Sequence, residues 1–193
     1  MKNKYLFTVF AAGSMLLAGF QHTHTYSIER YNKQHSHIAD ADGPSAGKTG
    51  APGESNCTSC HNGAAQDGSS VNTVVLTQGA TVVSGYTPGG VYNVAVAMST
   101  FSGINGFQIV ALNSSNAQAG TISILPSSGT QLKNGSAGKK YVTHTLAGNV
   151  QHAWAFQWTA PASDVGTVTF YLATNKTNES NSDSGVRASS AGS

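Results

Sequence analysis

Apolar and polar residues alternate through most of the chain beyond residue 71. In residues 92–98 the larger apolar side chains fall at every second position, and residues 152–158 repeat this pattern with two tryptophans and a phenylalanine. A period of two places alternate side chains on opposite faces of a strand. Both runs are therefore predicted to be strands with one buried face.

Further short runs have the same character. The segments 71–76, 79–83, 106–112, 121–125, 140–146 and 168–172 are rich in β-branched and aromatic residues, and glycine, proline, asparagine and serine separate them. In segment 140–146, the side chains of Val142, His144 and Leu146 would share one side. No long helical period follows the first 21 residues. The pattern predicts an all-β protein, an antiparallel immunoglobulin-like β-sandwich.

The N-terminus has the features of an export signal. Lys2 and Lys4 precede an apolar run from Tyr5 to Phe20, which is shorter than the roughly 20 apolar residues of a typical membrane-spanning helix. We expect a signal peptide over residues 1–21, with an uncleaved N-terminal anchor as the alternative. Because Phe20 stands where a lipoprotein signal needs cysteine, no lipid anchor is expected. The mature protein should be exported to the periplasm, the cell surface or the medium, without a membrane span.

The remaining chain divides into three predicted parts. Residues 22–55 are polar, contain glycine and proline breakers, and are predicted to form a flexible linker. Residues 56–68 form a loop around the two cysteines. Residues 69–193 are predicted to form the β-sandwich.

Composition narrows the classes of partner. Charged residues make up 9% of the chain, and removing the two leader lysines from ten Lys and Arg leaves eight, against eight Asp and Glu. A nearly neutral chain lacks the basic surplus that nucleic-acid phosphates require. It also gives no basis for an electrostatic membrane patch. We therefore expect neither nucleic acid nor a charged membrane surface as a partner.

The only two cysteines lie in the sequence Cys57-Thr58-Ser59-Cys60-His61. This C-x-x-C-H spacing is the attachment pattern of a c-type haem. The two thiols can form thioethers with the two vinyl groups of one porphyrin, and the adjacent histidine can reach the iron. The pattern predicts one covalent haem c, with Cys57 and Cys60 as its attachment points and His61 as the proximal iron ligand.

Other uses of this pair stay open. Cys57 and Cys60 can close a local disulfide, form a thiol redox pair, or contribute to a zinc site. No second C-x-x-C or H-x₃₋₅-H follows to complete four zinc ligands, and the flanking residues have the character of a loop rather than of a strand–helix junction. Export does not distinguish haem attachment from a disulfide, since both reactions take place outside the cytoplasm.

Three residues are candidates for the second axial position of a haem iron. His144 lies among apolar neighbours on a predicted strand, and Met98 is the methionine beyond the leader. His152 is a lesser candidate. For Met98, packing in the core is the expected role. For His144, a hydrogen-bonded structural histidine is the alternative to the distal ligand.

Several motifs together resemble a known family. They are G-K-T-G-A-P-G-E at 47–54 before the C-x-x-C-H, Y-T-P-G-G-V-Y at 86–92, G-F-Q at 106–108, Y-V-T-H-T at 141–145 and F-Q-W-T-A-P at 156–161. They resemble secreted Bacteroidetes-type proteins in which a single C-x-x-C-H precedes a reelin-type (reeler, or choice-of-anchor V) β-sandwich. The resemblance covers about residues 45–185. It implies a reeler-like fold and a histidine at position 144.

The C-terminus departs from that family. The sequence N-S-D-S-G at 181–185 is followed by Val186 and Arg187, where the family continues with one more strand and a sorting tail. We expect the final strand and the tail to be missing, which would leave a sheet edge unpaired.

Three hypotheses of function follow. The first is a secreted or cell-surface mono-haem c-type cytochrome that transfers electrons to an unknown redox partner. The alternative is a non-enzymatic extracellular adhesion or binding module, with a Cys57–Cys60 disulfide. A haem sensor or peroxidase-like protein with an open iron face is a third hypothesis. No G-x-S-x-G, H-E-x-x-H or phosphate-binding loop occurs, so an enzyme is not the expected reading.

Overall fold

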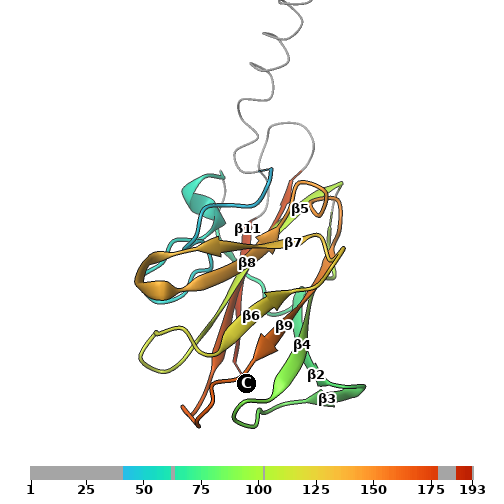
Figure 1. The fold of residues 1–193 in the computed structure, drawn as a ribbon. Helices are drawn as coiled ribbons and strands as arrows, with labels where there is room; N and C mark the ends of the chain where they lie inside the picture. Colours follow the sequence, from blue (N-terminus) through green and yellow to red (C-terminus); the bar gives the residue numbers. More distant parts are fainter. Residues whose placement is uncertain (1–40, 62–63, 102, 178–185, 193) are drawn as a thin grey trace, which may run out of the picture. The chain divides into compact units, whose positions relative to one another are not determined.

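The chain folds into two stacked β-sheets (Figure 1). The computed structural model describes residues 41–61, 64–101, 103–177 and 186–192. Within these ranges one sheet has six strands in the order β1-β11-β10-β5-β8-β7, and the other has five in the order β3-β2-β4-β9-β6. Neighbouring strands run antiparallel except for the β1–β11 pair. The predicted antiparallel sandwich is confirmed, and the predicted signal peptide lies outside the described residues.

The strands have the following bounds. The six-stranded sheet contains β1 (Gln66–Asp67), β11 (Val186–Gly192), β10 (Thr169–Thr177), β5 (Ile104–Leu112), β8 (Lys140–His144) and β7 (Thr130–Asn134). The five-stranded sheet contains β3 (Thr81–Val83), β2 (Asn72–Gln78), β4 (Val91–Met98), β9 (Ala153–Thr159) and β6 (Thr121–Ile124). Two short 3₁₀ turns, η1 (Cys57–Ser59) and η2 (Ser136–Gly138), are the helical elements of the described residues.

The core lies between the two sheets. Alternate residues of β4 and β9 point into it, as their sequence period predicts, and the facing residues of β5 and β10 complete it. Trp158 is fully buried and packs edge-on against Phe170 of the opposite sheet, with 5.3 Å between ring centroids. Aromatic side chains of the two sheets are therefore in direct contact.

Two differences from the sequence prediction concern β8 and β11. The strand expected over 140–146 ends at His144, because Thr145 donates its backbone N–H to the carbonyl of Gly129 and begins a turn. Leu146 is consequently 61% exposed and does not share the buried side of Val142. The expectation of a missing final strand is wrong, since β11 pairs with β10 along its whole length. The β11 sequence V-R-A-S-S-A-G has no apolar alternation, so backbone hydrogen bonding forms a strand that periodicity does not predict.

Residues 41–61, called the strap below, lie on the outer face of the six-stranded sheet (the blue and cyan chain in Figure 1). Ala46 and Ala51 belong to a second apolar cluster there, formed with Val110, Leu112, Tyr141 and Tyr171. Gln108 of β5 accepts the backbone N–H of Lys48 at 2.6 Å and donates to the carbonyls of Pro44 and Ser45. The described part of the predicted linker, residues 41–55, is thus packed on the sheet.

Glu54 is a second point at which the strap makes polar contacts with the sheet. Its carboxylate accepts the hydroxyl of Tyr141 on β8 at 2.6 Å and the ammonium of Lys139 at 3.0 Å. Thr49 donates to the other carboxylate oxygen at 2.6 Å. The carboxylate therefore joins the strap to β8 at a largely buried position.

Candidate functional site

A single helical turn carries both cysteines and the adjacent histidine. Asn56 begins it, and its side chain accepts the backbone N–H of Thr58 at 2.9 Å. The carbonyl of Cys57 then accepts the backbone N–H groups of Cys60 at 3.2 Å and His61 at 2.9 Å. These backbone hydrogen bonds hold Cys57, Cys60 and His61 in one short turn. The thiol of Cys60, in contrast to that of Cys57, is exposed.

The side chain of Lys48, a residue of the strap, forms hydrogen bonds on both sides of Cys57. Its ammonium donates to the hydroxyls of Ser55 at 3.0 Å and Ser59 at 2.9 Å, which flank Cys57 on either side. Since the backbone of Lys48 is held by Gln108 of β5, the turn is linked through one residue to the centre of the six-stranded sheet.

The turn packs on β10. The Cys57 thiol lies 3.8 Å from the carbonyl of Thr174, and His61 Nε2 lies 3.2 Å from Asn175 Nδ2. Burial raises the pKa of Cys57 to about 11, whereas Cys60 is exposed. A thiol redox pair works through a cysteine whose pKa is lowered. The environment of Cys57 therefore disfavours the redox-pair alternative.

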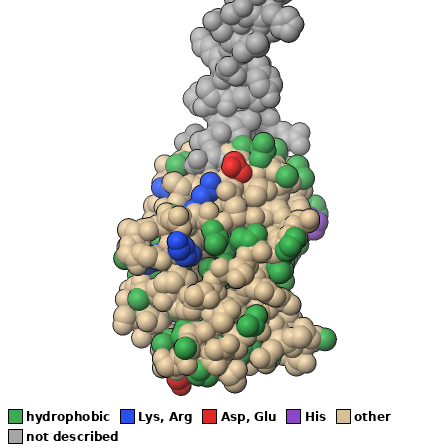
Figure 2. All heavy atoms as spheres, in the orientation of Figure 1, with side chains coloured by type: hydrophobic (Ala, Val, Ile, Leu, Met, Phe, Trp, Pro, Cys, Tyr) green, Lys and Arg blue, Asp and Glu red, His purple; other side chains and the backbone are tan. Residues whose placement is uncertain are grey.

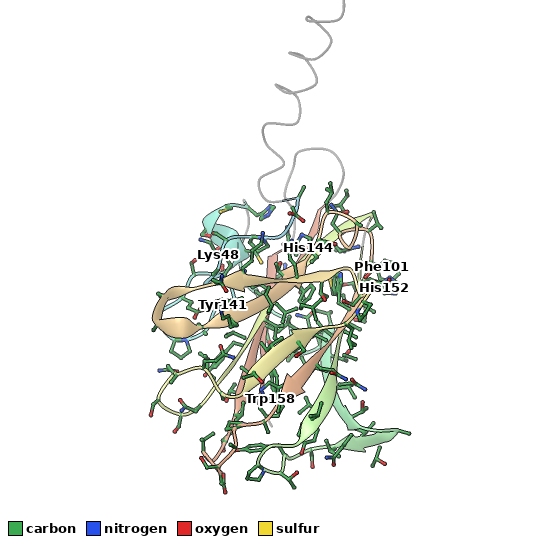
Figure 3. All side chains as sticks on the ribbon, in the orientation of Figure 1. Lys48, Phe101, Tyr141, His144, His152 and Trp158 are labelled. Atoms are coloured by element: carbon green, nitrogen blue, oxygen red, sulfur yellow. The ribbon has the colours of Figure 1, made fainter. Side chains whose placement is uncertain are left out.

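His144 lies at the end of β8, beside β5 (Figure 3). Its Nδ1 accepts the backbone N–H of Phe107 at 3.2 Å, and the side chain is 5% exposed. The ring fills the space above Gly106, where an added Cβ would lie 2.7 Å from the His144 Cε1. His144, the last residue of β8, therefore accepts a hydrogen bond from a backbone N–H of β5.

The other two candidate axial ligands lie elsewhere in the fold. Met98 is buried in the core between the sheets, in the cluster that also holds Val96 and Trp154. His152 stacks on the exposed ring of Phe101, with 3.9 Å between ring centroids (Figure 3).

The donor set of the turn fits a covalently attached haem in its chemistry. Cys57 and Cys60 offer two thiols with the required spacing, and His61 next to them offers an imidazole nitrogen. Within the described ranges, no group of three or more histidine, cysteine and acidic side chains is placed to hold a metal ion. A four-ligand zinc site is therefore not formed by these residues.

Sequence reasoning missed three residues of the site. Asn175 and Lys48 meet the turn only because strands and strap fold together. No local pattern marks Asn175, and the motif at 47–54 contains Lys48 without indicating this contact. Gly106 did carry a signal, since a glycine inside a strand often marks the close approach of another group. Here that group is the His144 ring.

Comparison with known proteins identifies the domain. The family model for the Reeler domain matches residues 55–180. The human F-spondin reeler domain is similar in structure, with a TM-score of 0.52 and 18% identity over 67% of this chain and 92% of that one. A second F-spondin structure, of the Reelin-N domain, gives a TM-score of 0.52 and 20% identity over 67% and 89%. No curated protein matches. Within the described ranges, no helix has the length and apolar character to cross a membrane. With well over half of its residues matched, this chain belongs to the Reeler domain family.

Proposed function

We propose that this chain is an exported, non-catalytic β-sandwich that binds neutral polysaccharide through the outer face of its five-stranded sheet. The observation that carries this proposal is that the five strands of that sheet contain no charged residue and no histidine. In Figure 2, by contrast, lysine side chains lie mainly over the strap and the β7–β8 hairpin in the upper half of the view. A face without charge favours an uncharged partner.

The chemistry of this face suits sugars. Ala95 and Ala155 face outward on neighbouring strands and offer methyl groups that can pack on the C–H surface of a pyranose. Asn93 and Gln157 lie opposite one another, 3.2 Å apart at their side-chain amides, and keep further donors and acceptors for sugar hydroxyls.

The size of the face suits a polysaccharide chain. Its strands are three to eight residues long and lie about 4.8 Å apart, which gives a face of roughly 500 Å². A face of this size has room for several sugar units.

A charged substitution tests this proposal. Ala95→Arg places a cation in the middle of the face and should weaken binding to insoluble cellulose, chitin or β-glucan about tenfold, because the charge must be desolvated. Ser115→Arg, in an exposed turn, is the matched control and should bind as the wild type does. Depletion of protein from solution by each polysaccharide measures the effect. Equal depletion of both variants, or no depletion of the wild type by any of these polymers, contradicts the proposal.

The cysteine turn favours a second, compatible function, that of a mono-haem c-type electron carrier. The observation in its favour is that one short turn, closed by two backbone hydrogen bonds to the Cys57 carbonyl, holds Cys57, Cys60 and His61. A haem held there would supply reversible one-electron chemistry at its iron. Cys57 and Cys60 would hold the porphyrin edge, and His61 would occupy the proximal position.

The intact mass and the pyridine haemochrome spectrum of the purified protein test this second function. The chain is expressed with its leader in a host that has c-type maturation machinery, then purified. We expect a mass gain of one haem and a pyridine haemochrome of the c type. Cys57→Ala combined with Cys60→Ala should abolish covalent haem, and Thr58→Ala, in the same turn, should retain it. A protein two protons light and without chromophore instead contains the Cys57–Cys60 disulfide.

A further inference from the structure

Polar side chains form a straight row across the outer face of the five-stranded sheet, one on each of four neighbouring strands. We infer that an extended, uncharged polysaccharide lies along this row, across the strands, and that Asn93 and Gln157 at its centre determine the specificity. This inference rests on the polysaccharide binding proposed above. It adds the class of polymer and the direction in which the polymer lies.

The register of the strands produces the row. Thr77 of β2 lies opposite Asn93 of β4, which lies opposite Gln157 of β9. Gln157 in turn lies opposite Ser123 of β6. The residue that precedes each of these four belongs to the core or packs against it, so the four side chains point outward. Figure 1 shows β6, β9, β4 and β2 side by side in this order. At about 4.8 Å between strands, the row spans roughly 14 Å.

The two central side chains keep most of their capacity for hydrogen bonds. The Gln157 amide donates to the Asn93 carbonyl oxygen at 3.2 Å, and the two side chains make no other hydrogen bond with described residues. A primary amide has two N–H donors and an oxygen with two lone pairs. The contact between the amides therefore orients both groups and leaves donors and acceptors on each for the hydroxyl groups of a sugar.

Exposed valines border the row on both sides and at one end. Val91 is 51% exposed and lies two residues before Asn93 on β4. Val75 is 36% exposed and lies two residues before Thr77 on β2, which runs antiparallel to β4. Val82 of β3 is 69% exposed and lies opposite Thr77. The C–H faces of sugar rings can cover these side chains and remove apolar surface from water.

The pattern along the strands does not offer the same contacts. The outward residues of β4 are Val91, Asn93, Ala95 and Ala97. A polymer along β4 would meet one polar side chain, whereas a polymer across the strands meets one on each of four strands. Hydroxyl groups taken out of water need hydrogen-bond partners. The direction across the strands is therefore the one that satisfies a chain of sugars.

A straight row on a flat face also favours one shape of polymer. An extended chain such as cellulose or chitin presents hydroxyl groups along a straight line. The helical chain of starch turns successive hydroxyl groups away from a flat surface. Since the strands of this sheet contain no charged residue, the polymer is also uncharged.

Two threonines of β2 provide a matched pair of variants. Thr77 belongs to the row, whereas Thr73 faces outward on the same strand but lies opposite Ala97, outside the row. In depletion isotherms with insoluble cellulose and chitin, Thr77→Ala should bind about two- to tenfold more weakly, the usual effect of one hydrogen bond. Thr73→Ala should bind as the wild type does.

A double variant tests the centre of the row. Asn93→Ala combined with Gln157→Ala should bind cellulose and chitin at least tenfold more weakly than the wild type, because both amides are lost. The wild type should bind granular starch more weakly than either extended polymer. Circular dichroism confirms that each variant is folded.

The outcomes distinguish the inference from the proposed function. Equal losses of affinity in Thr73→Ala and Thr77→Ala would show a polymer lying along β2 and would overturn the inference alone. Unchanged affinity of the double variant has the same meaning, as does a wild type that binds starch or β-glucan but neither cellulose nor chitin. A wild type that binds none of these polymers overturns both the inference and the polysaccharide binding on which it rests.

Discussion

Replacing Trp158 with alanine is expected to lower the free energy of unfolding by about 3–5 kcal/mol, the usual cost of deleting a fully buried aromatic side chain. Trp158 is 0% exposed and contacts rings from both sheets, with 5.7 Å to the Tyr92 centroid and 5.3 Å to that of Phe170. Its indole N–H donates to the carbonyl of Ala119 at 2.8 Å. Alanine would leave a cavity and an unsatisfied carbonyl together.

Urea unfolding followed by far-ultraviolet circular dichroism measures this effect. Trp158→Phe should lose less stability than Trp158→Ala, because it retains most of the buried aromatic ring while it loses the indole N–H. Gln157→Ala, the neighbouring residue on the outer face of β9, is the matched control and should change stability by under about 0.5 kcal/mol. A loss below about 1 kcal/mol for Trp158→Ala would show that the sheets are not held together at this point.

Replacing Glu54 with alanine is expected to cost about 2–4 kcal/mol and to loosen the strap. The carboxylate is 8% exposed and its Lys139 partner 14%, so removing it leaves an ammonium and the Tyr141 hydroxyl without their shared acceptor in a poorly hydrated place. Removing one partner of a buried ion pair destabilises the protein by more than the intact pair stabilises it, because the other charge is left buried without a partner. Because the strap carries the cysteine turn, its contacts with β10 should loosen as well.

The same carboxylate gives stability a pH dependence. Burial acts to raise the pKa of Glu54, but hydrogen bonds from Thr49, Tyr141 and Lys139 outweigh burial and hold the pKa below its usual 4.5. A lowered pKa in the folded state means that the stabilisation is complete above about pH 4.5 and is lost as pH falls through the folded value.

Unfolding free energies between pH 6 and 3 test this dependence. The wild type should lose stability on acidification more steeply than Glu54→Gln, which keeps the shape of the side chain but cannot titrate. Hydrogen exchange of the strap amides, compared between wild type and Glu54→Ala, reports whether the strap itself opens. Parallel pH profiles for wild type and Glu54→Gln would show that the carboxylate is not coupled to folding.

The strands that alternation predicted are those with one face in the core. β4 and β9 place large apolar residues at every second position, so burial alone determines which face turns inward. β7 and β11 were missed because neither has such a pattern: β7 has the single apolar residue Leu132, and β11 is made mostly of small residues. Strands of this kind form because a neighbouring strand offers unpaired backbone groups.

What the sequence by itself determined is local. Cys57, Cys60 and His61 lie in one short turn because the hydrogen bonds of that turn join neighbouring residues alone. What only the tertiary structure decided is which distant residues meet that turn. Asn175 lies more than a hundred residues from His61, and its position depends on the register of β10 between β5 and β11. The arrangement of His144 over Gly106 depends on where β8 stops. Register and strand ends are set by packing of the whole sandwich, and no local pattern contains them.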